Sequence, residues 1–223
     1  MVNPYNDYLS SRIDFTLRTR IKICGITRLE DAKAAIHAGC DALGFVFYKE
    51  SPRYIPLDAF KGLAKELPPF VTKVGLFVNA ESAYIKEAIQ SGLVNILQFH
   101  GDETSDFCRQ FKFPYIKAVA VSSSVDLLQY EKDFYDADAL LLDAPHEYLK
   151  GGTGQTFDWN LIPLSLSKPI VLAGGLNADN VKEAIKKVKP YAVDVSGGVE
   201  ESKGIKNSHK IQAFIKETQD AAV

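Results

Sequence analysis

The segment 21–47, IKICGITRLEDAKAAIHAGCDALGFVF, places short apolar runs on either side of a helical pattern. Runs such as IKIC and ALGFVF are typical of strands that are covered on both faces. Between them, Thr27 and Glu30 have the spacing of a capping box, and Gly39 is placed to end the helix. A strand, a helix and a second strand in this order predict one parallel β–α–β unit.

The same alternation continues along the rest of the chain. Eight apolar runs are predicted to be strands: Ile21–Cys24, Ala42–Phe47, Val71–Phe77, Ile96–Phe99, Tyr115–Val119, Ala139–Leu142, Ile170–Ala173 and Ala192–Val195. Helices are expected at Leu57–Leu67, Glu103–Phe111, Trp159–Leu166 and Asn207–Glu217, from Asn79 to Gly92, and from an Asn177 cap to just before Pro190. The segment Ser122–Ala137 has the least regular helical pattern.

Eight strands alternating with crossovers predict an α/β fold, a (β/α)8 TIM barrel. A doubly wound sheet is the competing arrangement, but no glycine fingerprint follows the first strand and eight repeats fit a chain of 223 residues. No linker divides the chain, so residues 20–223 are predicted to form a single catalytic domain. Residues 1–19 lie outside the repeat and are interpreted as an N-terminal extension that is flexible or docked on the surface.

The net charge and the cysteine content of the chain limit the kinds of partner and the compartment that we expect. A net charge of −2 provides no broad basic surface for nucleic acid or an anionic membrane, and no apolar run is long enough to cross a bilayer. The three cysteines Cys24, Cys40 and Cys108 are sparse and odd in number, which favours a reducing cytoplasm over a disulfide framework. We therefore expect a cytoplasmic protein that binds neither nucleic acid nor a membrane.

Active sites of barrels lie at the C-terminal ends of the strands, which turns the strand assignments into candidate residues. Cys24 ends the first predicted strand, and Asp143 directly follows the sixth. A thiol can act as a base when a nearby cation or helix N-terminus lowers its pKa from about 8.5. The alternatives are a small buried hydrophobe for Cys24 and a structural hydrogen-bonding role for Asp143.

Glycine-rich turns follow the seventh and eighth strands, at Gly174–Gly175 and Ser196–Gly198, and a third run spans Gly151–Gly154. Glycine allows backbone N–H groups to approach an anion closely, and these loops often bind phosphate in barrels. Three such loops at one rim favour a phosphate site, although any one of them could simply form a tight turn.

Four further side chains are candidates for the pocket. Arg53 follows the second strand and could hold a carboxylate bidentately, or it could be a solvated loop residue. Gln98 and His100 flank the end of the fourth strand, where a histidine alone is more often structural. Asp194 lies within the eighth strand and could orient neighbouring loops.

Several blocks of this sequence resemble the phosphoribosylanthranilate isomerase family of tryptophan biosynthesis. They are Lys22–Thr27, Gly44–Tyr48, Ser51–Tyr54, Gly75–Asn79, Gln98–Gly101, Leu142–Asp143, Gly151–Trp159, Ala173–Asn177 and Asp194–Glu200. The blocks occur in the family's order and cover the chain from about Ile21 to the end, which makes the resemblance specific. Residues 1–19 depart from it, because family members usually begin close to the first strand.

The resemblance implies an isomerase that carries out an Amadori rearrangement of N-(5-phosphoribosyl)anthranilate without a metal or organic cofactor, as a monomer or homodimer. By the same resemblance, Asp143 is the general acid, Cys24 is the general base and Arg53 contacts the anthranilate carboxylate. The residues implied to hold the phosphate are Gly174, Gly175, Ser196, Gly197 and Gly198.

Two other readings remain. A barrel similar to indole-3-glycerol phosphate synthase would need a catalytic lysine and a longer N-terminal helical segment, and Lys22 lies two residues before the strand end. A catalytically silent barrel that only binds a phosphorylated ligand would have no need of both Cys24 and Asp143.

Overall fold

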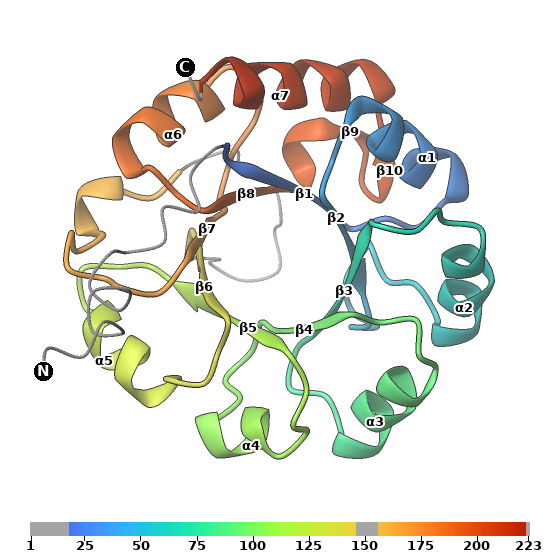
Figure 1. The fold of residues 1–223 in the computed structure, drawn as a ribbon, viewed down its shortest axis with the longest axis horizontal. Helices are drawn as coiled ribbons and strands as arrows, with labels where there is room; N and C mark the ends of the chain where they lie inside the picture. Colours follow the sequence, from blue (N-terminus) through green and yellow to red (C-terminus); the bar gives the residue numbers. More distant parts are fainter. Residues whose placement is uncertain (1–17, 146–155, 222–223) are drawn as a thin grey trace, which may run out of the picture.

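The computed structural model describes residues 18–145 and 156–221, and its eight parallel strands close into a barrel (Figure 1). The strands are β1 (Arg20–Cys24), β2 (Ala42–Val46), β3 (Thr72–Phe77), β4 (Ile96–Phe99), β5 (Tyr115–Ala120), β6 (Ala139–Asp143), β7 (Ile170–Leu172) and β8 (Ala192–Val195). The predicted (β/α)8 barrel is confirmed, and all eight predicted strands are present with ends shifted by at most one residue.

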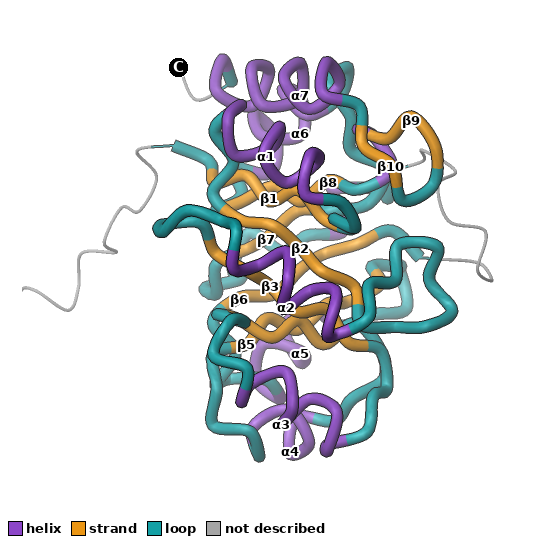
Figure 2. The backbone as a smooth tube through the Cα atoms, turned by 90° about the vertical axis from the view of Figure 1, so that its right-hand side faces the viewer, coloured by secondary structure: helices purple, strands orange, loops and turns teal. Residues whose placement is uncertain are grey.

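Helices form a ring outside the barrel (Figure 1). They are α1 (Leu29–Ala38), α2 (Leu57–Lys65), α3 (Ser82–Gln90), α4 (Ser105–Arg109), α5 (Leu127–Asp133), α6 (Val181–Val188) and α7 (Ser208–Asp220). Two single 3₁₀ turns, η1 (Trp159–Leu161) and η2 (Gly197–Val199), and a short hairpin of β9 (Glu200–Ser202) and β10 (Ile205–Lys206) complete the described elements. The hairpin lies beside α1 (Figure 2). None of the helices in the described residues is long and apolar enough to cross a membrane.

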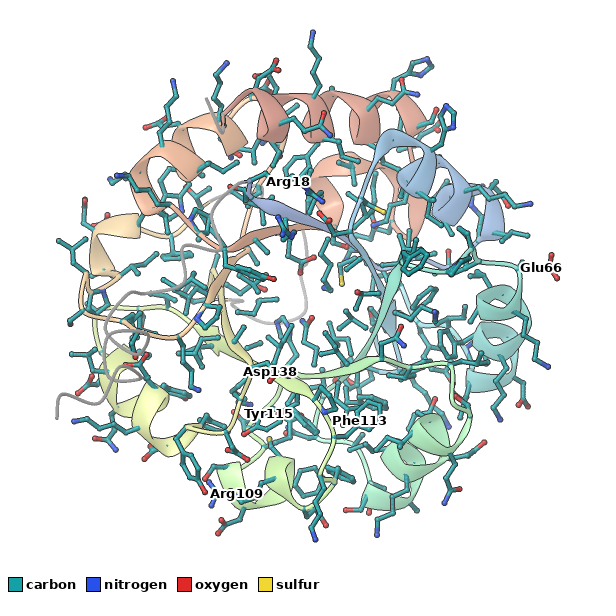
Figure 3. All side chains as sticks on the ribbon, in the orientation of Figure 1. Arg18, Glu66, Arg109, Phe113, Tyr115 and Asp138 are labelled. Carbon is teal, nitrogen blue, oxygen red and sulfur yellow. The ribbon has the colours of Figure 1, made fainter. Side chains whose placement is uncertain are left out.

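Strand β1 closes the barrel because it pairs with β2 on one side and with β8 on the other. Side chains alternate along it: Ile21 and Ile23 belong to the large apolar cluster packed under the helices, whereas Lys22 and Cys24 face the barrel interior. A second apolar cluster, built from β5, β6, β7 and β8, fills that interior. Figure 3 shows side chains filling both the barrel and the layer between strands and helices.

Helix starts were predicted less well than strands. Arg28, not Thr27, is the N-cap of α1, because the Thr27 hydroxyl donates instead to the Gly204 carbonyl at 2.7 Å. Helix α6 begins four residues after Asn177, with Asn180 at its N-cap.

Two further helix predictions need correction. Helix α3 starts at Ser82, because Asn79 adopts a left-handed conformation (φ 47°) that a helix start does not allow. The helix predicted at Trp159–Leu166 is a single 3₁₀ turn at its first three residues. The predicted extension, residues 1–19, lies outside the described residues except for its last two.

A buried ion pair outside the barrel holds the loops after β3 and β4 together. Lys117 Nζ lies 2.8 Å from Glu103 Oε2, and the two side chains are 3% and 2% exposed. Glu103 also accepts the backbone N–H groups of Asn79 (2.8 Å) and Gly101 (2.9 Å), and Lys117 donates to the Gly101 carbonyl at 2.6 Å. Glu103 and Lys117 therefore hold Gly101, the residue that directly follows His100, in place.

We expect Glu103→Ala to destabilise the protein by about 3–5 kcal/mol, because it leaves Lys117 buried without its counter-ion and two N–H groups unpaired. Urea unfolding followed by circular dichroism measures this difference. Asp58→Ala is the control, since Asp58 is paired with Lys61 on the surface with its side chain 94% exposed. Equal losses in the two variants would contradict the assignment of Glu103 as a structural anchor.

Candidate active site

The carboxyl ends of the eight parallel strands lie at one rim of the barrel, and four neighbouring strands bring the predicted groups there. Asp143 ends β6, Gly174 and Gly175 follow β7, the turn η2 follows β8, and Cys24 ends β1. In barrel order these strands run β6, β7, β8, β1, so the glycine turns lie between the strand of Asp143 and the strand of Cys24.

Asp143 is oriented by a chain of hydrogen bonds. His100 Nε2 lies 3.2 Å from Asp143 Oδ2, and His100 Nδ1 lies 2.8 Å from Gln98 Nε2. The other carboxylate oxygen of Asp143 accepts the Ala144 N–H at 2.8 Å. With Gln98 Nε2 donating to Nδ1, the imidazole carries its hydrogen on Nε2, facing Asp143. The arrangement gives His100 a role in positioning Asp143.

The Cys24 thiol is buried, and the residue beside it on β2 is Gly44. A Cβ atom at Gly44 would lie 2.7 Å from Cys24 Sγ, so glycine makes room for the sulfur. Burial raises the pKa of the Cys24 thiol, and the nearby cations Lys22 and Lys206 oppose that rise. Lys22 Nζ is itself paired with Asp194 Oδ2 at 3.0 Å.

Arg53 forms a two-pronged ion pair with Glu200, with Nε and Nη2 each 2.7 Å from a carboxylate oxygen. Lys206 Nζ also contacts Glu200 Oε1 (2.9 Å) and donates to the Ser196 carbonyl (3.1 Å). Its side chain is 0% exposed and that of Glu200 is 7% exposed, and these cations lower the pKa of Glu200. Arg53 is therefore not the solvated loop residue of the alternative interpretation, because the hairpin β9–β10 fixes it.

Close backbone approach explains two of the glycines at the rim. Gly174 has φ 80°, and a Cβ atom there would lie 2.5 Å from the Ala144 nitrogen. At Gly198 an added Cβ would overlap the Leu176 carbonyl. Gly197 is different, since its Cβ would meet only Arg53 Nη2 at 3.4 Å, an ordinary contact. This places the Arg53 guanidinium over the start of η2.

The structure thus sorts the predicted residues into two contact groups. The first group is Gln98, His100, Asp143 and Gly174. The second is Arg53, Ser196 and Gly197, and within it Gly25 lies against both Arg53 and Ser196. Asp194 lies within β8 and is paired with Lys22. The glycine run 151–154 lies outside the described residues.

Three residues in these contacts were missed by the sequence analysis as members of the site: Lys22, Glu200 and Lys206. Lys22 had a detectable signal, since it is a charged residue two positions before Cys24 in an otherwise apolar strand. Glu200 and Lys206 carried no local signal, because their importance depends on Arg53, which is far away in the sequence.

The chain is similar throughout its barrel to known proteins of one kind. The family model described as N-(5'phosphoribosyl)anthranilate (PRA) isomerase matches residues 21–217. The N-(5'-phosphoribosyl)anthranilate isomerase of Nitrosospira multiformis is 53% identical over 197 residues, covering 88% of this chain and 95% of that relative. The enzyme of the same name from Pseudomonas putida GB-1 is 53% identical over 202 residues, covering 91% of this chain and 98% of its own.

Solved structures agree. The phosphoribosyl anthranilate isomerase of Thermotoga maritima superposes with a TM-score of 0.84 at 43% identity, covering 91% of this chain and 99% of its own. A phosphoribosyl anthranilate isomerase in complex with reduced 1-(o-carboxyphenylamino)-1-deoxyribulose 5-phosphate has a TM-score of 0.77 at 39% identity, with coverages of 91% and 99%. Sequence and fold lead to the same conclusion: the chain belongs to the N-(5'-phosphoribosyl)anthranilate isomerase family.

Proposed function

We propose that this protein converts N-(5-phosphoribosyl)anthranilate into 1-(2-carboxyphenylamino)-1-deoxyribulose 5-phosphate in tryptophan biosynthesis. The observation that carries the proposal is the position of a thiol, Cys24, and an acid, Asp143, on strands that flank the glycine turns after β7 and β8. A phosphosugar anchored at those turns would lie between the strands that carry the two groups. Family membership supports the same reaction.

Asp143 is the proposed general acid. It donates a proton to the ring oxygen of the ribose, the C1–O bond breaks, and the anthranilate nitrogen supplies the electron pair that forms the iminium. His100 Nε2 lies 3.2 Å from Asp143 Oδ2, where its N–H can donate to the carboxyl group. His100 thereby keeps the carboxyl oriented toward the rim and stabilises the carboxylate that is left.

Cys24 is the proposed general base. Its thiolate removes the proton from C2, and the released electron pair forms the C1–C2 double bond while the iminium nitrogen becomes a neutral amine. This enolamine then tautomerises to the ketone. The thiolate fraction of Cys24 grows with pH, and we expect turnover to rise with it. Because burial raises the pKa of this thiol, the rise should occur at higher pH than for an exposed cysteine.

Substrate binding is proposed to use two sets of donors at the rim. The proposed phosphate site consists of backbone N–H groups at Gly174, Gly175, Ser196, Gly197 and Gly198. The short helix α6 follows Gly174 and Gly175, and Asn180 at its N-cap donates to the Gly175 carbonyl at 3.0 Å. Arg53, held by Glu200, would present its remaining N–H groups to the anthranilate carboxylate.

The proposal also covers the compartment, the domain organisation and the oligomeric state of the enzyme. The three cysteines are free and buried, which supports a reducing cytoplasm. We propose a single catalytic domain, residues 20–223, that acts as a monomer or homodimer on a small molecule. The similar phosphoribosylanthranilate isomerase of Thermotoga maritima is dimeric, and its structure has been solved as generated monomers.

We expect Cys24→Ser and Asp143→Asn each to lower kcat by about 10²–10⁴-fold, because a positioned acid or base contributes that much. Product affinity should change far less, since neither group is the main binding anchor. The loss of substrate fluorescence on turnover measures kcat, and titration calorimetry measures product binding. A folded Cys24→Ser enzyme with near-normal kcat would refute the proposed role of the thiol.

We expect Gly197→Val to weaken binding of the product by roughly 10- to 100-fold, because the side chain blocks an N–H donor to a charged phosphate. Gly197 tests the loop without a strained φ angle, and Gly62→Ala is the matched control because a Cβ there meets nothing within 4 Å. Titration calorimetry with the product and with its dephosphorylated form measures the effect. Equal weakening of both ligands would place the phosphate elsewhere.

A further inference from the structure

Lys22 is a buried charge in the centre of the barrel, a place that barrels ordinarily fill with branched apolar side chains. Its Nζ lies 3.0 Å from Asp194 Oδ2, and the two side chains are 5% and 8% exposed. Removing two charges from water is costly, and an apolar pair of similar volume is often as stable or more stable. Packing alone therefore does not account for this pair.

Strand geometry brings the lysine to Cys24. The two residues lie two positions apart on β1 and so face the same side of the strand. A Cβ atom at Gly44 would lie 2.7 Å from Cys24 Sγ and 3.1 Å from Lys22 Cε, so both side chains converge over this glycine. The ammonium group and the thiol therefore lie in the same buried space, where the charge of Lys22 lowers the pKa of Cys24.

We propose that Lys22, held in place by Asp194, is a positioning residue whose ammonium group stabilises the thiolate of Cys24 during proton abstraction. The inference rests on the proposed role of Cys24 as the base. Asp194 then has a role as well, because its carboxylate keeps Lys22 protonated and holds the ammonium group in position.

The charges around the thiol agree with this assignment. Besides Lys22, the charged groups near enough to act on Cys24 are Asp194 from β8, Lys206 from β10 and Arg53 from the loop after β2. Burial raises the pKa of the thiol most, and Lys22 is the largest influence that lowers it, ahead of the opposing effect of Asp194. The Asp194 pair keeps the pKa of Lys22 above its ordinary value despite full burial.

Lys22→Met tests the proposal, because methionine replaces the charge with an apolar chain of similar length. The readout is the pH dependence of alkylation of Cys24 by iodoacetamide, followed on the Cys24 peptide by mass spectrometry. The midpoint should move to higher pH, and kcat at neutral pH should fall about 10- to 100-fold with little change in KM. Lys22→Arg, which keeps the charge, should restore part of the loss.

Two further variants separate this effect from a general loss of stability. The double variant Lys22→Met, Asp194→Asn leaves no unpaired buried carboxylate, and its midpoint should also rise because the effect of Lys22 exceeds that of Asp194. Lys117→Met removes a different buried lysine, on the outer side of the barrel, and should leave the Cys24 midpoint unchanged.

An unchanged midpoint in both the single and the double variant would overturn the proposal and leave Lys22 as a core residue. A shift of equal size in Lys117→Met would also overturn it. If the midpoint rises in the Lys22 variants while Cys24→Ser retains full kcat, the interaction of lysine and thiol stands and the proposed role of Cys24 as the base fails.

Discussion

Parallel pairing of β1 with both β2 and β8 is the constraint on which the rest of this structure depends. It closes the sheet, and closure brings the carboxyl ends of all the strands to one rim. It also fixes which side chains face inward, since a shift of one residue in β1 would exchange Ile23 for Cys24 in the barrel. The site follows from this register, because Cys24 and Lys22 belong to the inward set.

The interior of the barrel is divided by polarity. Strands β5, β6 and β7 fill it with residues such as Ile116, Leu141 and Val171, whereas β1 and β8 contribute the ion pair of Lys22 and Asp194. The apolar part stabilises the barrel by burial. The polar part sets the local field beneath the rim, and a buried charge acts more strongly there than in water. The buried ion pair and most of the apolar filling of the barrel thus lie on different strands of one sheet.

The strands and the rim could be predicted from sequence because both depend on local patterns. Apolar runs predicted the strands. Cys24 and Asp143 lie at the ends of predicted strands, and this alone indicated that they were candidate catalytic residues, without comparison with any related protein. Helix starts depended on tertiary competition, as at Thr27, whose hydroxyl bonds to the Gly204 carbonyl instead of capping α1. The fixing of Arg53 by Glu200 and Lys206 was unpredictable for the same reason, since it joins segments about 150 residues apart.

The central claim is that the acid and the base act on different atoms of one bound phosphosugar. A crystal structure of this protein with reduced 1-(o-carboxyphenylamino)-1-deoxyribulose 5-phosphate would test it most directly. The account predicts Cys24 Sγ within about 4 Å of C2, the Asp143 carboxyl on the former ring oxygen, and the phosphate at η2. A ligand whose C2 faces Asp143, or whose phosphate lies away from the turns after β7 and β8, would contradict it.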